Sequence, residues 1–345
     1  MNLNQGDLYF IGERDVLTGT VSPYYKIGLV KESRDGDSED RLSEHQTGNP
    51  RSLFVHHAVT APAVSDLEAT MHDLHATARI LGEWFEFGDE GLPDAIAVAE
   101  SLAAEQRENL AAFQAAVDLK GTYSSGLVRE PSDDDRHWYA AAVTSKVTAK
   151  AVAGLLGRSS KVLRQAHKDR HDVTRFVSVI TKAPKSKFDK AAFKRAHPEI
   201  HDSFLVEKTA FRPRFDLKVP KEVEEAVGLD DAVAAATEEF AATITRAEGD
   251  VDQLEALHMG HLGILRFQAR AGWDHEIAVA NLKMLCGDAD GVSGLLSWKR
   301  ADSTTQVFDA SAFGEQHPDL LAEFTVEEQP EAFRVLPMRS YALKA

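Results

Sequence analysis

Five polar side chains near the start of the chain are of the types that phosphodiester hydrolysis uses. Glu68 is a lone carboxylate that suits Mg²⁺ or Mn²⁺, with waters and a substrate phosphate filling the other coordination positions. Arg41 can bind a phosphate oxygen bidentately, and His45 can accept or relay a proton near neutral pH. Tyr9 and Lys26 are two candidates for the group that activates the attacking water. Each side chain also has an ordinary structural interpretation, because tyrosines pack in strands and charged residues cover exposed helix faces.

Three strands and two helices would position these residues. Apolar runs rich in aromatic and β-branched residues predict the strands, over residues 7–12, 24–30 and 53–60. A short helix over residues 38–46 would carry Arg41 and His45 four residues apart, and therefore on one face. A second helix, from residue 65 or 66 to about residue 80, would carry Glu68.

The order of these segments resembles the GIY-YIG nuclease domain, in particular its phage-type branch. The resemblance covers about residues 6–88, a quarter of the chain. The segments that carry it are Lys26-Ile27-Gly28, Arg41-Leu42, Gln46-Thr47-Gly48-Asn49-Pro50, Leu67-Glu68 with Met71-His72, and Gly82-Glu83-Trp84-Phe85. It implies a three-stranded antiparallel sheet with flanking helices, one divalent cation and cleavage of DNA.

The resemblance also implies a role for each of the five side chains. Tyr9 matches the tyrosine of the first family triplet, and Lys26 stands where many members have a second tyrosine. Arg41 and His45 match the arginine and histidine that follow, and Glu68 matches the metal-binding glutamate. The lysine at position 26 leaves two possibilities for the base, because either Tyr9 or a Lys26 with a lowered pKa could take a proton from water.

Composition limits the class of protein. The length of 345 residues suggests two or three domains, and an apolar fraction of 43% is enough for ordinary cores. The single cysteine, Cys286, excludes an internal disulfide framework and a Cys-rich zinc cluster. No apolar run reaches the length of a membrane span, and the first residues lack the regions of a signal peptide. We therefore expect a cytoplasmic protein with no membrane partner.

Charge is unevenly distributed along the chain, whose net charge is −16. Residues 136–221 hold 20 Lys and Arg but only 7 Asp and Glu, so the remainder is strongly acidic. A basic segment between acidic flanks indicates a nucleic-acid partner, here DNA, although a solvated basic surface has the same composition. The residues expected to contact DNA recur at roughly helical spacing: Arg158, Lys161, Arg164, Lys168 and Arg170.

An internal repeat lies in the second half of the chain. Residues 188–207 align without gaps to residues 308–327, and each copy combines an Asp N-cap, flanking Phe residues and a His-Pro step. We interpret these identities as scaffold. Before the first copy, two helices are predicted, over 143–156 and 159–168. The expected domains are a nuclease-like domain (1–120), a linker (121–136), a basic repeat module (137–221), a helical connector (222–256) and an acidic repeat module (257–345).

The second copy resembles the C-terminal part of YqaJ-type viral recombinase exonucleases. In those proteins a helix, a tryptophan-bearing strand and an FD…HP helix pair follow the catalytic core; the strand here would be Ser297-Trp298-Lys299-Arg300. No acidic nuclease core precedes either copy, so the resemblance implies an accessory fold rather than a second active site.

The sequence therefore predicts an α+β protein with a small three-stranded antiparallel sheet and flanking helices, followed by a mainly helical region with a duplicated α+β module. The function it favours is that of a metal-dependent DNA endonuclease of phage, mobile-element or bacterial-defence origin. Two alternatives stay open: a DNA-binding or regulatory protein with an inactive nuclease-like domain, and a helical interaction protein. The sequence leaves the oligomeric state and the DNA specificity open.

Overall fold

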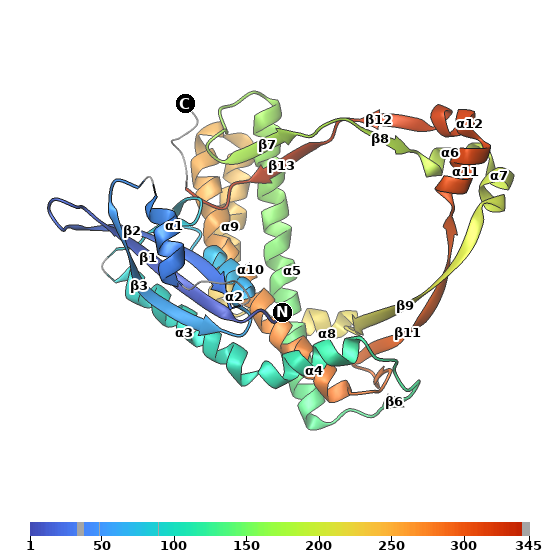
Figure 1. Ribbon diagram of the computed structural model, residues 1–345, viewed down its shortest axis with the longest axis horizontal. Coiled ribbons are helices and arrows are strands. Elements are labelled where there is room, and N and C mark those ends of the chain that lie inside the picture. Colours follow the sequence, from blue (N-terminus) through green and yellow to red (C-terminus); the bar gives the residue numbers. More distant parts are fainter. Residues whose placement is uncertain (33–37, 48, 89, 340–345) are drawn as a thin grey trace.

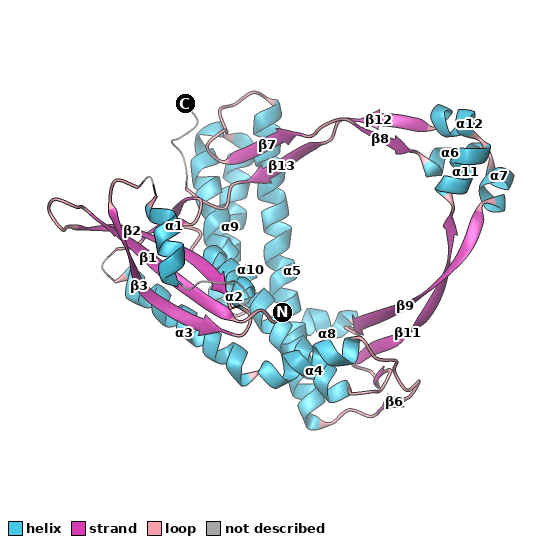
Figure 2. Ribbon diagram, viewed as in Figure 1, coloured by secondary structure: helices cyan, strands magenta, loops and turns pink. Residues whose placement is uncertain are grey.

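The computed structural model describes residues 1–32, 38–47, 49–88 and 90–339 of the chain. It is an α+β protein in which a twisted sheet lies beside a body of long helices (Figure 1). From that body two strand ribbons extend to a group of short helices at the far end of the molecule (Figure 2). Within the described ranges, no helix combines the length and the apolar character that crossing a membrane would require.

The three strands predicted near the start of the chain are present and pair antiparallel. They are β1 (Gly6–Arg14), β2 (Val21–Lys31) and β3 (Ser52–Ala61), with β1 in the centre. Two short strands, β4 (Arg79–Leu81) and β5 (Trp84–Glu86), extend the sheet, so that its order is β3-β1-β2-β5-β4. The sheet is therefore larger than the predicted one by two strands at the β2 edge.

The two faces of this sheet have separate cores because strand side chains alternate between them. Leu8 and Phe10 belong to the larger core, which also includes residues of several helices. Among them are α2 (Val64–Leu74), α3 (Gly91–Glu108) and α10 (Leu254–Cys286). Tyr9 and Ile11 point to the opposite face, where Leu42 of α1 (Ser38–Gln46) covers them. Helix α2 ends at Leu74, several residues before the predicted end, and the chain then turns into β4.

The helical body is built around α5 (Asp133–Lys168) and α10, which pack against each other. The two helices predicted over 143–156 and 159–168 are one continuous helix, whose start is fixed by a capping box between Ser132 and Asp135. Packing against α10 outweighs the helix-weakening glycines of this segment. Ser159 Oγ lies 2.7 Å from His261 Nδ1 of α10 in the buried interface. Three further helices complete this part: α4 (Leu110–Lys120), α8 (Lys221–Ala226) and α9 (Asp231–Gly249).

The two repeat copies pair with each other instead of forming separate modules. Each of three strands in and around the first copy is hydrogen-bonded to a strand in or around the second, in antiparallel register. The pairs are β7 (Val177–Thr181) with β13 (Glu331–Val335), β8 (Lys185–Phe188) with β12 (Thr325–Glu328), and β9 (Leu205–Leu217) with β11 (Leu296–Phe308). We call the last pair, thirteen residue pairs long, the long ribbon. The basic and acidic segments are thus halves of one structure.

The ribbons meet in a compact unit that we call the helical knob. It consists of α6 (Lys190–Ala196), α7 (Pro198–Ser203), α11 (Ala310–Gln316) and α12 (Pro318–Glu323). The Asp189 backbone N–H donates to the Phe324 carbonyl at 2.8 Å, and the Asp309 N–H donates to the Phe204 carbonyl at 2.9 Å. The two repeat copies therefore exchange equivalent bonds. Asp189 and Asp309 cap α6 and α11, as predicted, and phenylalanines of both copies share one core.

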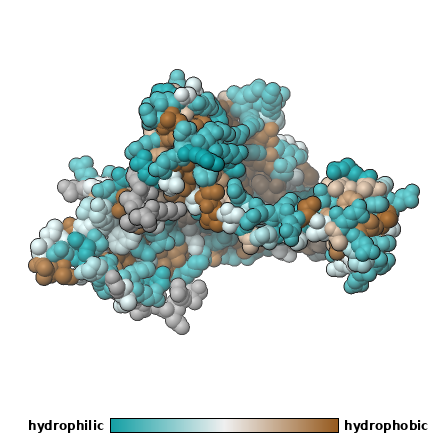
Figure 3. All heavy atoms as spheres, turned by 90° about the horizontal axis from the view of Figure 1, so that it is seen from above, coloured by the Kyte–Doolittle hydropathy of each residue, from teal (hydrophilic) through white to brown (hydrophobic). Residues whose placement is uncertain are grey.

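The segment expected to be a linker, residues 121–136, is tied to the second half of the chain. Its strand β6 (Val128–Arg129) pairs in parallel with β10 (Gly291–Val292). Arg129 donates to both carboxylate oxygens of Asp135 at 2.7 Å and to the Leu285 carbonyl at 2.7 Å. The face of the molecule drawn in Figure 3 is largely hydrophilic. One exception is the tip of the β1–β2 hairpin, where Leu17 is 93% exposed.

Candidate active site

Tyr9 is the centre of a polar cluster on the α1 side of the sheet. Its side chain is only 1% exposed, and its hydroxyl lies 3.3 Å from His45 Nε2. The ring lies over Gly28, its partner across the β1–β2 ladder. A Cβ added to Gly28 would lie 2.5 Å from the Tyr9 hydroxyl oxygen. The glycine of the KIG segment is therefore the residue that leaves room for the Tyr9 ring.

Helix α1 contributes Arg41 and His45 from one face, as their spacing predicts. Burial raises the pKa of Tyr9, and a hydrogen bond with Arg41 offsets only part of this rise. Arg41 also forms an ion pair with Glu44, while its buried Nε has no hydrogen-bond partner among the described residues. The pKa of His45 is lowered by burial and then by the positive charges of Lys26 and Arg41. His45 is thus neutral near pH 7 and can accept a proton.

The turn between α1 and β3 is fixed by the Gln46 side chain. Its amide nitrogen donates to the carbonyls of Asn49 and Arg51, at 3.1 and 2.9 Å. Its oxygen accepts the Leu53 backbone N–H at 2.8 Å. Gly48 of the same motif lies outside the described residues. Because these bonds join the end of α1 to the start of β3, they hold the helix over the Tyr9 side of the sheet.

Lys26 lies on the same face of the sheet and is paired with an acid. Its Nζ is 2.8 Å from Glu83 Oε2, and the lysine side chain is 12% exposed. Glu83 precedes β5, whose Trp84 stands opposite Lys26 in the ladder. Burial would raise the pKa of Glu83, but the hydrogen bond and charge of Lys26 outweigh this and hold it below its ordinary value. An ammonium held beside an ionised carboxylate has no lone pair with which to accept a proton.

Glu68 approaches the cluster from α2. Its pKa is raised to about 7, first by burial and then by the negative charge of Glu83, against the opposing charge of Lys26. The Glu68 carboxylate in turn raises the pKa of Tyr9. The two acids therefore act on each other and on the Tyr9 hydroxyl. We call Tyr9, Lys26, Arg41, His45, Glu68 and Glu83 the Tyr9 cluster.

His72 anchors the helix that carries Glu68. The two lie one helical turn apart on α2, and His72 Nε2 is 3.0 Å from the Ile27 carbonyl oxygen of β2. His72 is buried, and burial lowers its pKa to about 4, so it is a neutral donor to that carbonyl. This bond fastens α2 to the edge of β2 next to Gly28. Glu68 lies one turn earlier on the same helix.

The charge balance of the Tyr9 cluster favours an anionic ligand with a cation. Lys26 and Arg41 are positive, Glu83 is negative, and Glu68 is close to half protonated at neutral pH. Burial and the neighbouring carboxylate keep Glu68 partly protonated, and a bound divalent cation would favour its ionised form. Mg²⁺ is commonly held by one or two carboxylates, with water and phosphate oxygens completing its shell. Glu68 and Glu83 fit that donor set, although no group of three or more acids and histidines is formed by the described residues.

The five predicted DNA-binding residues lie far along the chain from the Tyr9 cluster, at the end of α5. All five are exposed. Arg158 lies 3.6 Å from Glu248, and Arg164 lies over the Phe333 ring at 4.6 Å. Two of the five thus have partners within the chain, and DNA contact by all five stays a prediction.

Two participants were not predicted as site residues. Glu83 belongs to the closing GEWF segment, and its role depends on β5 pairing with β2, which brings it to Lys26. Arg79 of β4 also acts on the cluster, where its charge lowers the pKa of both Glu68 and Glu83. Predicting strands over residues 79–86 would have placed both Glu83 and Arg79 at the β2 edge of the sheet.

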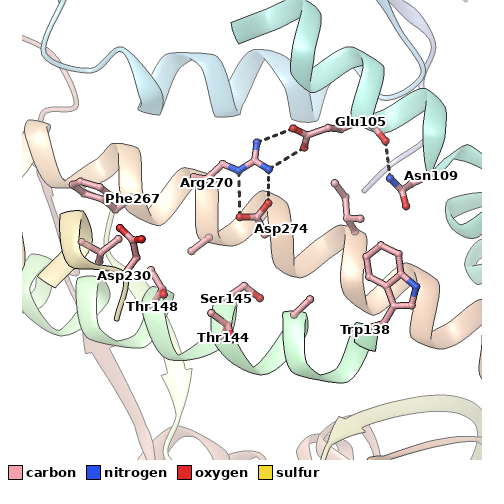
Figure 4. Close-up of a pocket in the computed structure, with 14 residues that line it drawn as sticks. Glu105, Asn109, Trp138, Thr144, Ser145, Thr148, Asp230, Phe267, Arg270 and Asp274 are labelled. Carbon is pink, nitrogen blue, oxygen red and sulfur yellow. Dashed lines mark hydrogen bonds and ion pairs between the residues drawn. The ribbon is translucent and has the colours of Figure 1, made fainter. Parts of the chain in front are cut away.

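A separate pocket lies between α3, α5, α9 and α10 (Figure 4). Its arginine, Arg270, is held by Glu105 at 3.0 and 3.1 Å and by Asp274 at 2.6 Å. Trp273 Nε1 donates to the same Glu105 carboxylate at 2.9 Å. Because two carboxylates already neutralise Arg270, the described residues that line this pocket offer no free cation to a phosphate. Its lining includes none of the Tyr9 cluster.

Comparison of the chain with protein-family models, with curated proteins and with solved structures finds no match. The function must therefore be inferred from the geometry of the Tyr9 cluster.

Proposed function

We propose that the chain is a metal-dependent DNA endonuclease of the GIY-YIG type, with the Tyr9 cluster as its active site. The observation that carries this proposal is the meeting of Tyr9, Arg41 and His45 around one hydroxyl, with the ion pair of Lys26 beside it. Phosphodiester hydrolysis needs a proton acceptor for water, cationic groups for the phosphate, and usually a metal. The cluster offers a proton acceptor in His45 and cationic groups in Lys26 and Arg41. Glu68 and Glu83 are the carboxylates that would hold the metal.

The proton of the attacking water would pass through Tyr9 to His45. Because burial raises the Tyr9 pKa, the hydroxyl does not ionise beforehand. It can instead accept a proton from water while giving its own to His45 Nε2, 3.3 Å away. His45 is suited to accept it because its lowered pKa keeps the imidazole neutral. Of the two candidate bases, this arrangement favours Tyr9, since Lys26 is held as an ammonium.

Arg41 and Lys26 would stabilise the phosphate. The free Nε of Arg41 is a donor that a phosphate oxygen can satisfy. Lys26 adds a positive charge that Glu83 holds in place. Glu68, with Glu83, would hold the divalent cation. A bound Mg²⁺ or Mn²⁺ supplies neutralisation of the charge that develops on the phosphate and on the leaving oxygen.

Nicking of supercoiled plasmid DNA in Mg²⁺ or Mn²⁺ tests the proposal. Arg41→Ala should lower the cleavage rate by about 100-fold or more, because one preorganised donor contributes about 3 kcal/mol to transition-state stabilisation. Glu100→Gln is the control, since this exposed acid pairs only with His57, at 3.0 Å, outside the cluster. Equal cleavage by Arg41→Ala and wild type would show that the cluster is not the active site.

A further inference from the structure

The two faces of the long ribbon differ in what covers them. Antiparallel pairing puts Phe215 opposite Trp298 and Phe211 opposite Asp302 on one face. That face is anchored to the rest of the protein. Trp298 is buried in the core beside α10, and Tyr123 donates a hydrogen bond to Asp302 at 2.9 Å while its ring meets Phe211 edge-on at 4.9 Å.

The opposite face of the long ribbon is basic. It carries Lys208, Arg212 and Arg214 from β9, and Lys299 from β11 stands directly across from Arg214. All four side chains are exposed, and in the part of the chain that the structure describes none of them forms an ion pair. The other positions of this face are small, hydroxyl-bearing or aliphatic, apart from Asp216 near one end. We call the four cations the basic ribbon face.

The chain as a whole has a net charge of −16. Some of its other exposed cations have acidic partners; Lys150 with Glu224 and Lys221 with Glu225 are examples. Four unpaired cations on one face repel each other, and an anionic partner relieves that repulsion. The four cations lie on one side of the long ribbon, and its other side is anchored to the protein. This arrangement indicates that their anionic partner is an external polyanion.

The dimensions of the long ribbon suit duplex DNA. Thirteen residue pairs extend about 44 Å at about 3.4 Å per residue, more than one turn of B-DNA. The major groove of B-DNA is about 12 Å wide and admits a two-stranded β-ribbon. The narrow major groove of an RNA duplex does not admit side chains in the same way.

We propose that the basic ribbon face binds duplex DNA in the major groove, through phosphate contacts by its four cations. The choice of DNA as the polyanion rests on the proposed function. The basic ribbon face itself follows from the register of β9 and β11 and does not depend on that function. The long ribbon thereby replaces the end of α5 as the principal DNA-binding element, since Arg158 and Arg164 of α5 already have partners in the chain.

Salt-dependent binding to a 30-base-pair duplex, followed by fluorescence anisotropy in EDTA, tests this inference. Each phosphate contact contributes about 0.9 to the slope of log K against log salt, so four contacts contribute about 3.6. The ribbon variant Lys208→Gln/Arg212→Gln/Arg214→Gln/Lys299→Gln should therefore bind with a slope lower by about 3 to 4. The single variants Arg212→Gln and Arg214→Gln should each lower it by about 1, which keeps the test valid if the quadruple variant folds poorly.

An α5 variant removes the same number of charges and serves as the matched control: Arg158→Gln/Lys161→Gln/Lys168→Gln/Arg170→Gln. A larger loss of slope in the ribbon variant than in the α5 variant supports the inference. An unchanged slope in the ribbon variant, an equal loss in both variants, or tighter binding to an RNA duplex of the same sequence overturns it. Wild-type protein that binds no DNA at any salt would instead contradict the proposed function.

Discussion

Replacing Glu68 by glutamine should stabilise the metal-free protein at alkaline pH. The pKa of this carboxyl is raised from 4.5 to about 7, first by burial and then by the charge of Glu83. The folded protein therefore binds more protons than the unfolded chain between these two pH values. Stability is lost as the pH rises through this interval, because the folded state must hold an unfavourable charge. Glutamine carries no charge and does not suffer this loss.

The expected size of the effect follows from the shift in pKa. A shift of this size corresponds to about 3 kcal/mol at full linkage. Because Glu68 is only partly buried, solvent screening reduces the expected difference to about 2 kcal/mol. Glu68→Gln should thus match wild type near pH 4.5 and exceed it by about 2 kcal/mol at pH 8.

Urea unfolding in EDTA, followed by tryptophan fluorescence at both pH values, measures this difference. Mg²⁺ should then stabilise wild type more than Glu68→Gln, because the variant lacks one of the two carboxylates proposed to hold the cation. Glu100→Gln, which changes an exposed acid, should behave as wild type at both pH values. Equal stability of Glu68→Gln and wild type at pH 8 would refute the assignment of Glu68 as a strained, cation-binding carboxylate.

Three further predictions concern the Tyr9 cluster. Tyr9→Phe keeps the ring over Gly28 but removes the hydroxyl. Single-turnover cleavage by this variant should slow by about 100-fold or more, while its circular-dichroism spectrum should match that of wild type. Cleavage at the wild-type rate would exclude the proton relay. Gly28→Ala should destabilise the protein by about 1–3 kcal/mol in urea unfolding and abolish cleavage, because its Cβ would displace the Tyr9 ring. Gly154→Ala is the control, because it lies at a helical position with open space and should leave stability unchanged or raise it. If Gly28→Ala and Gly154→Ala changed stability equally, Tyr9 would not pack closely on Gly28. The cleavage rate should fall as the pH drops through the lowered pKa of His45, below its ordinary value of 6.5, and His45→Gln should lack this acid limb.

The parts of the fold that local patterns determine were predictable from the sequence. The strands β1, β2 and β3 follow from alternating and aromatic-rich runs, and α1 from a short polar segment closed by a turn. The spacing of Arg41 and His45 gave their common face correctly, and the meeting of both with Tyr9 followed from the order of the segments.

What the sequence could not supply was the choice of non-local partners. The pairing of Glu83 with Lys26 requires β5 to join β2, across nearly sixty residues of chain. Helix α2 ends earlier than the sequence predicts, at Leu74. The bond from His72 to the Ile27 carbonyl depends on how this helix packs against β2. The long ribbon joins strands from two repeat copies, and a repeat identifies related segments without showing that they pair. The basic face of that ribbon is visible only once its register is known.

Single-turnover cleavage of a labelled DNA duplex in Mg²⁺, by wild type and by Glu68→Gln, is the most direct test of the Tyr9 cluster as a hydrolytic centre. Metal-dependent cleavage by wild type, lost in Glu68→Gln and in EDTA, is the result that this account predicts. Cleavage of equal rate by both proteins, or no cleavage by wild type in either Mg²⁺ or Mn²⁺, would contradict it.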